Sequence, residues 1–174
     1  MMKLFWGFTL ILLDVPLELG SASIELLPDF LGYFLLMRGM EPFLDEERFF
    51  ARGRHAAFGL MLLSIVLWIA ALTDPQTKTA IAIWGGTLAA EIVGLVLLHG
   101  TAREICGLEQ KKQWYLHGER IRSMVPVVMT MQIICKLLDW IPVVGRIALL
   151  AGAVTSCCFL AAFWNTSRRF QNLK

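Results

Sequence analysis

The sequence predicts an all-α integral membrane protein, a helical bundle of about six transmembrane helices with both termini in the cytoplasm. Three observations carry this prediction. Of the 174 residues, 57% are hydrophobic and only 17% are charged, whereas a soluble domain is about half apolar. The charged residues lie between long apolar runs. Basic residues alternate between rich and poor connections along the chain. No linker divides residues 1–174, so we expect one domain.

Four apolar segments are long enough to cross a bilayer. A transmembrane helix needs about 20 mostly apolar residues, and four segments come close to that length: residues 56–73, 80–99, 124–141 and 143–164. Two earlier apolar runs, at residues 4–13 and 26–37, are shorter. Each reaches a spanning length only by including its neighbouring acids. We therefore predict six helices, of which the first two form a short acidic hairpin.

The acids beside the two short runs are spaced four residues apart. Asp14 and Glu18 follow the first run, and Glu25 and Asp29 border the second. Residues four apart are neighbours on a helix surface. Each pair of acids is therefore predicted to lie on one side of its helix.

Pro28 and Asp29 mark the predicted start of the second helix. Proline lacks the amide that would be unpaired there, and aspartate complements the positive end of the helix dipole. A helix from Pro28 to Met40 is about 20 Å long at 1.5 Å per residue, which is less than a full span. Two arrangements remain open for the chain before it. It is irregular at membrane depth and lines a cavity, as in the broken helices of transporters, or it belongs to a helical hairpin whose acidic turn meets outside water.

Lysine and arginine alternate between the connections. Cytoplasmic connections are enriched in these residues, and three regions carry most of them: residues 38–54, 103–122 and 168–174. The intervening connections are poor in bases, with none in residues 14–25 and one each at Lys78 and Arg146. This alternation places both termini in the cytoplasm and requires all six helices.

A cleaved signal peptide is the alternative for the N-terminus. Lys3, a ten-residue apolar core and the small residues GSAS at 20–23 fit its outline. However, Asp14 and Glu18 fall between that core and any cleavage point, and cleavage would leave an odd number of helices. We therefore expect residues 1–22 to be retained.

Ionisable residues inside the spans are the candidates for a functional site. Each costs about 2.5–3.5 kcal/mol on insertion scales, so it needs a partner or water. Glu91 lies near the middle of its apolar segment. Gln132, Lys136 and Asp139 follow one another at i, i+4 and i+7, so they share one face of the fifth predicted helix. Lys136 is therefore a candidate partner of Glu91, of Asp139 or of the N-terminal acids.

The predicted threading gathers the polar residues toward the outer half of the membrane. The candidate intramembrane polar site consists of Glu91, Gln132, Lys136, Asp139, Asp14, Glu18, Glu25 and Asp29. Because so much charge is costly against lipid, we expect these residues to face a shared polar cavity or the aqueous surface.

Rows of small residues occur on two of the predicted spans. Gly86, Ala90 and Gly94 form one row, and a second row consists of Ala148, Gly152 and Ser156. Such rows let helix backbones approach closely. They serve either packing within the chain or a homodimer, and the sequence leaves both open.

The stretch LLPDFLGYFLLMRGM carries a resemblance. With the acidic apolar segment before it, this stretch resembles the LPDFxGY signature of an uncharacterised family of small bacterial multi-span membrane proteins, through Pro28, Asp29, Gly32 and Tyr33. The resemblance covers about the first 40 residues. It implies a multi-pass protein of the bacterial cytoplasmic membrane and carries no activity to transfer.

Motifs of known chemistry are missing from the sequence. It contains no HExxH, P-loop or GxSxG motif, and its four cysteines and three histidines lack the spacing of a zinc site. We therefore identify no catalytic residue, no metal site and no cofactor, lean against an enzyme, and find no signal for nucleic-acid binding.

Two functions remain open. The first is a small-solute or ion transporter, proton-coupled through Glu91, with an outward-facing polar cavity. The second is a non-catalytic membrane subunit or scaffold, which docks partner proteins through its helices and its cytoplasmic loops. In both cases the lipid bilayer is the first partner, and a homodimer or another membrane protein is the second.

Overall fold

The computed structural model describes the backbone of the chain except at residues 14–15, 20–21, 26–28, 74–80, 115–117, 139–140 and 173–174. The side chains of residues 16–19, 22–25, 71–73, 81–84 and 142 lie outside the description as well.

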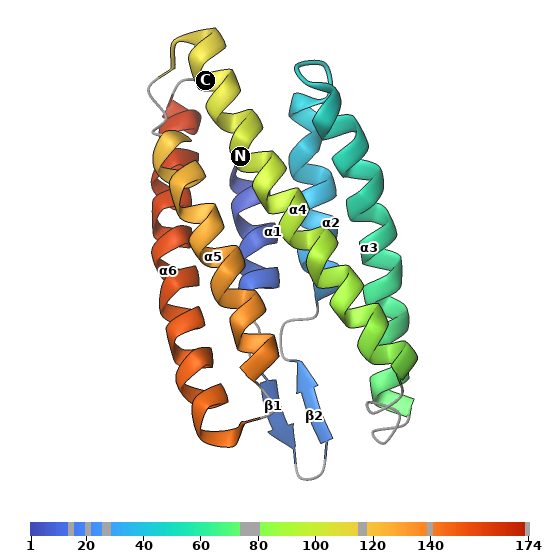
Figure 1. The fold of residues 1–174 in the computed structure, drawn as a ribbon. Helices are drawn as coiled ribbons and strands as arrows, with labels where there is room; N and C mark the ends of the chain where they lie inside the picture. The colour runs from blue at the N-terminus through green and yellow to red at the C-terminus, as the bar shows by residue number, and fades with distance from the viewer. Residues whose placement is uncertain are drawn as a thin grey trace.

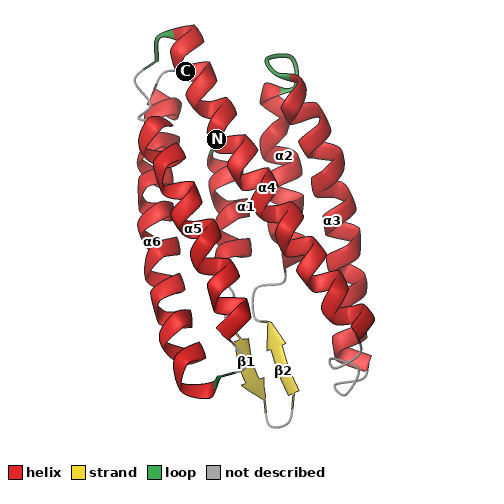
Figure 2. Cartoon of the chain, viewed as in Figure 1, coloured by secondary structure: helices red, strands yellow, loops and turns green. Residues whose placement is uncertain are grey.

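Within the described residues the chain forms six α-helices, one short 3₁₀ helix and one β-hairpin (Figures 1 and 2). In chain order these are α1 (Met2–Leu12), β1 (Pro16–Leu19), β2 (Ala22–Glu25), α2 (Asp29–Met40), η1 (Glu41–Phe43), α3 (Arg48–Thr73), α4 (Ile81–Lys112), α5 (Gly118–Leu138) and α6 (Pro142–Asn172). The predicted all-α bundle of six helices is therefore confirmed.

The helices pack in a closed ring. Each helix packs against the next one in the chain, from α1 to α6, and α6 packs against α1. The two ends of the bundle differ (Figure 1). One end, here the termini end, holds the start of α1, η1 and the last residues of α4 and α6. The other, the hairpin end, holds β1, β2 and the turn from α5 to α6.

Four of the helices are long and apolar enough to cross a membrane. These are α3, α4, α5 and α6, and they correspond to the four predicted spans. Three of them continue well beyond the apolar segments at the termini end, since α3 begins at Arg48, α4 ends at Lys112 and α6 ends at Asn172. Glutamate, lysine, arginine and glutamine in these extensions are good helix formers. The protein is therefore a candidate multi-pass membrane protein.

The first two helices are short, as predicted. α1 has 11 residues and α2 has 12. At 1.5 Å per residue each is about 17–18 Å long, roughly half of the apolar thickness of a bilayer. Asp29 is the first residue of α2 and lies in its first turn, as expected, while Pro28 lies outside the described residues.

The segment between α1 and α2 differs from the prediction. Glu18 and Glu25 do not lie on helices: they lie in β1 and β2, which pair antiparallel with Pro16 opposite Glu25. The prediction that each pair of acids shares a helix side is therefore wrong for both. The physical reason is in the sequence. Pro16 lacks the amide that a helix needs, and Gly-Ser, at residues 20–21, is a common sequence between the strands of a tight hairpin.

The apolar core lies in the half of the bundle at the termini end. There α1 and α2 complete the ring, and the large side chains that are fully buried come from all six helices: Leu4, Phe8, Tyr33, Leu36, Met40, Phe50, Leu98, Ile105, Ile121, Phe159 and Phe163. In contrast, none of the described residues 65–70 on α3 and 129–138 on α5 is buried. The core therefore depends on the two short helices.

Glycines let α1 and α2 approach backbone to backbone. A Cβ on Gly7 would lie 2.9 Å from the Gly32 carbonyl oxygen, and one on Gly32 would lie 2.9 Å from the Gly7 carbonyl oxygen. A Cβ on Gly39 would lie 2.7 Å from the Leu4 amide nitrogen. Real Cβ atoms essentially never come so close to backbone atoms, so this interface accepts only glycine at these positions.

The small-residue rows of α4 and α6 also face neighbours within the chain. Gly152 lies against α5, since a Cβ there would lie 2.8 Å from Cys135 Sγ. On α4, a Cβ at Gly94 would lie 3.2 Å from the Tyr33 hydroxyl, and one at Gly86 would be in ordinary contact with Leu67. Of the two uses left open by the sequence, the structure shows packing within the chain.

Replacing Gly32 by alanine is expected to lower the free energy of unfolding by about 1–3 kcal/mol, because overpacking a tight contact costs that much. Gly59→Ala is the matched control, since a Cβ on this helical glycine meets nothing within 4 Å. It should be neutral or slightly stabilising. Unfolding in detergent micelles, followed by circular dichroism, measures both. Equal effects of the two substitutions would contradict the close contact.

Candidate functional site

Tyr33 connects a short helix to a spanning helix. Its side chain is only 1% exposed, and its hydroxyl donates a hydrogen bond of 3.4 Å to the Ala90 carbonyl oxygen on α4. Gly94, one turn further along α4, leaves the space that the phenol ring occupies. The Gly-Tyr pair of the LPDFxGY motif thus has two structural tasks: Gly32 packs on α1, and Tyr33 packs on α4.

Glu91 follows the residue to which Tyr33 is bonded, and it pairs with Lys136. The distance from Glu91 Oε2 to Lys136 Nζ is 3.9 Å. Glu91 lies ten residues into α4, which places it about 15 Å along the helix from Ile81, while Lys136 lies in the last turn of α5. The side chain of Glu91 is 26% exposed and that of Lys136 is 53% exposed. The pair is therefore loose and open to its surroundings.

Gln132 faces a different neighbour from Lys136. Its side-chain amide donates to the Ser156 hydroxyl on α6 at 3.2 Å. On the same side of α5, the Cys135 thiol donates to the Ala148 carbonyl oxygen at 3.1 Å. The polar face predicted for α5 is thus divided: Lys136 pairs with α4, whereas Gln132 holds α6.

Asp29 lies between the ion pair and the hairpin end. It is one helical turn before Tyr33 on α2 and is partly buried. Both α2 and α4 run from the hairpin end toward the termini end (Figure 1). Because Tyr33 is bonded to Ala90, one turn of about 5.4 Å places Asp29 nearer the hairpin end than Ala90, whereas Glu91 lies one residue nearer the termini end. Asp29 therefore lies on the hairpin side of the ion pair of Glu91 and Lys136.

The other residues of the predicted site are described only in part. Asp14 and Asp139 lie outside the described residues. For Glu18 and Glu25 the backbone alone is described, in strands at the hairpin end (Figure 2). Within the predicted site, the described residues that contact each other are therefore Glu91 and Lys136.

The termini end is held by ion pairs that the sequence reasoning missed. Glu41 pairs with Arg38 at 3.2 Å and with Arg54 at 3.7 Å. The Lys111 ammonium pairs with Glu47, and that of Lys112 pairs with Glu46. The lysines and glutamates are separated by more than sixty residues, so no local spacing could have identified them. They tie the last turn of α4 to the segment between α2 and α3.

Aromatic rings close the core beneath these ion pairs. Phe43 stacks near Phe50, with ring centroids 5.1 Å apart, and near Phe170 at 5.6 Å. Trp114 contacts Phe170 at 5.4 Å. The termini end is therefore filled by rings from η1, α3, α6 and the end of α4.

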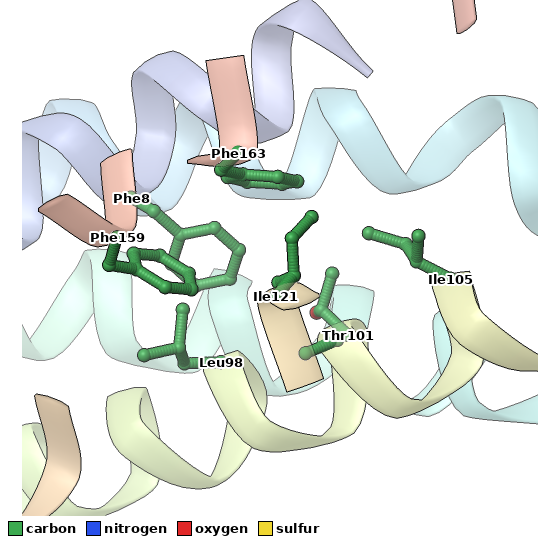
Figure 3. Close-up of a pocket in the computed structure, with 8 residues that line it drawn as sticks. Phe8, Leu98, Thr101, Ile105, Ile121, Phe159 and Phe163 are labelled. Atoms are coloured by element: carbon green, nitrogen blue, oxygen red, sulfur yellow. The ribbon is translucent and has the colours of Figure 1, made fainter. Parts of the chain in front are cut away.

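The centre of the same half is apolar and dry. Figure 3 shows a small void there, lined by Phe8, Leu98, Thr101, Ala102, Ile105, Ile121, Phe159 and Phe163. This void leaves no room for a water molecule. Between the Glu91 level and the termini end, the interior is thus packed with hydrocarbon.

The chemistry available at the site is that of a carboxylate and an ammonium. Among the described residues, no group of His, Cys, Asp and Glu side chains is arranged to hold a metal ion. Comparison with known proteins adds no activity: no family model, curated protein or solved structure matches the chain.

The ion pair is expected to contribute a coupling energy of about 0.5–1 kcal/mol, as exposed or membrane-embedded polar pairs do. A double-mutant cycle of Glu91→Gln and Lys136→Met, measured by unfolding in mixed micelles, tests this. Glu91→Gln combined with Arg120→Met is the control, because Arg120 lies in the first turn of α5, far from Lys136. The control pair should be additive. A coupling energy of zero between Glu91 and Lys136 would contradict their contact.

Proposed function

We propose that the protein is a small-solute or ion transporter of the bacterial cytoplasmic membrane, proton-coupled through Glu91. The observation that carries this proposal is the pair of Glu91 and Lys136, two charges facing each other inside candidate spans at 3.9 Å. Charges at such depth are costly and commonly mark ion pathways and proton relays. Asp29, in the first turn of α2 on the hairpin side of this pair, adds a further acid.

The uneven construction of the bundle supports an outward-facing site. Toward the termini end, the interior is closed by the apolar core and the aromatic rings. Toward the hairpin end, the short helices stop and the described parts of α3 and α5 bury no residue. Helices that end at membrane depth occur at transporter binding sites. The polar site therefore opens toward the hairpin end.

The proposed coupling uses the looseness of the ion pair. While Glu91 is ionised, Lys136 neutralises it, and the site carries no net charge from the two groups. A proton taken up by the Glu91 carboxylate removes its charge and releases the Lys136 ammonium. The released ammonium then attracts an anionic solute, or the site releases a bound cation. Tyr33, bonded to the residue before Glu91, transmits this change to α2.

Proton flux into vesicles tests the transport proposal. We expect wild-type protein in vesicles of phosphatidylethanolamine and phosphatidylglycerol, loaded with the pH dye pyranine, to carry protons when a potassium diffusion potential is applied. Glu91→Gln should lower the flux to that of empty vesicles, because the amide takes up no proton. Glu119→Gln, an exposed acid in the first turn of α5, should retain it. Wild-type flux equal to that of empty vesicles would contradict proton coupling.

We place the termini end, and with it both termini, in the cytoplasm. Most of the lysines and arginines of the chain lie on the elements of this end, as the positive-inside rule requires. The arrangement of the helices supports this proposal, because all three basic regions of the sequence meet at one end (Figure 1).

Cysteine labelling of intact cells tests this orientation. In a chain without native cysteines, Arg146→Cys near the hairpin end should react with a membrane-impermeant maleimide from outside. Asp45→Cys, exposed at the termini end, should react only after the membrane is permeabilised. The reverse pattern would overturn the orientation and leave the fold unaffected.

A non-catalytic membrane subunit or scaffold is the second candidate function. In the described residues, the exposed side chains of Arg48, Arg52, Arg103 and Arg122 at the termini end form no ion pair, which suits docking of an acidic partner. Co-purification of a stoichiometric partner, lost on replacing these arginines, would favour this function. Transport by the purified chain would favour the first.

A further inference from the structure

We propose that a surface patch on α1 and α6 near the termini end binds the headgroup of an anionic phospholipid. The patch consists of two indole rings, Trp6 and Trp164, and two cations, Lys3 and Arg168. This inference is independent of transport and rests only on the bundle lying in a membrane.

The two tryptophans form the apolar part of the patch. The rings of Trp6 on α1 and Trp164 on α6 lie edge to face, with centroids 6.3 Å apart. Phe5 fixes the pair from the core side, at 5.0 Å from Trp164 and 5.3 Å from Trp6. Although it belongs to this cluster, Trp6 is 49% exposed. Exposed tryptophan near the end of a membrane helix bundle is typical of the membrane–water interface.

The two cations lie on the same side of the indoles. The Arg168 guanidinium carbon lies 5.7 Å from the Trp164 ring centroid, one turn closer to the termini end. Lys3 precedes Trp6 by three residues and therefore shares its face of α1. Because α1 and α6 run in opposite directions and touch at Trp6 and Trp164, Lys3 and Arg168 both lie on the termini side of the two tryptophans along their helices.

Among the described residues neither Lys3 nor Arg168 forms an ion pair, and in this they resemble Arg48, Arg52, Arg103 and Arg122 at the same end. Lys111, Lys112 and Arg38 each pair with a glutamate. In contrast, neither α1 nor α6 contains an aspartate or glutamate along its whole length. At this end the elements flanking them carry two acids: Glu41 on η1, which pairs with Arg38 and Arg54, and Glu119 on α5, which Arg120 and Arg122 accompany. Two positive charges beside exposed indole therefore suit an anion from outside the chain.

An anionic phospholipid supplies both parts of the complement. Its phosphate accepts hydrogen bonds from the Arg168 guanidinium and the Lys3 ammonium, and its acyl chain covers the exposed face of Trp6. Basic pockets between transmembrane helices bind lipid headgroups in this manner. The soluble alternative, inorganic phosphate, would use the cations but leave the indole uncovered.

Native mass spectrometry of the full chain in detergent tests the proposal, with phosphatidylglycerol and phosphatidylcholine as competing probes. We expect preferential retention of phosphatidylglycerol. Lys3→Gln with Arg168→Gln should weaken its binding by about 30-fold, since each basic residue near an anionic surface contributes about a fivefold effect. Arg168→Gln alone should weaken it by about fivefold.

Arg48→Gln with Arg52→Gln is the matched control, because it removes two exposed charges at the same end of the bundle. This control should change binding by less than about threefold if attraction is local. Equal weakening by the two double variants would overturn the proposal, as would equal retention of both lipids. Displacement of the lipid by inorganic phosphate at millimolar concentration would assign the cations to a soluble anion and also overturn it. Thermal unfolding of each variant verifies that it is folded.

Discussion

The short length of α1 and α2 is the constraint on which the other features of the bundle depend. Two helices of 11 and 12 residues complete a ring of six helices at one level only. At that level large apolar side chains from all six helices are buried. Beyond it, four long helices and a β-hairpin remain. The bundle is therefore closed by apolar packing at the termini end, where the two short helices lie.

Glycine is what allows two such short helices to hold their place. A short apolar helix buries little surface, so each contact has to be close. Gly7, Gly32 and Gly39 bring the backbones of α1 and α2 together, and Tyr33 then fastens the pair to α4. The same tyrosine contact places Asp29 on the hairpin side of Glu91. The contact of Tyr33 with α4 thus holds the short helices in place next to the candidate site.

The ion pairs at the termini end and the ion pair inside the candidate spans have different roles. At the termini end, glutamates and lysines from distant segments neutralise one another over a floor of aromatic rings. Within the candidate spans, a loose ion pair joins α4 to α5. A loose pair in a costly environment can exchange partners more readily than a tight one, because less interaction energy has to be replaced. This difference is the physical basis for assigning function to Glu91 and a structural role to the termini-end pairs.

Much of this architecture is determined by the sequence alone. Hydropathy identifies the four spanning helices, since about 20 apolar residues in a row have few other uses. The short second helix follows from Asp29 at its start, and Glu91 and Lys136 stand out as charges inside apolar runs. These features are local in the chain, so a single sequence is enough to read them.

Only the tertiary structure decided which residues these polar side chains contact. Lys136 had three candidate acids in the sequence, and the helix arrangement brings it to Glu91. Gln132 was placed with Lys136 by spacing, yet it bonds to Ser156 on α6. The strands of Glu18 and Glu25 were missed because helical spacing of acids is also compatible with a hairpin. Contacts between segments far apart in the chain depend on how the helices pack, and helix periodicity fixes only which face each residue occupies.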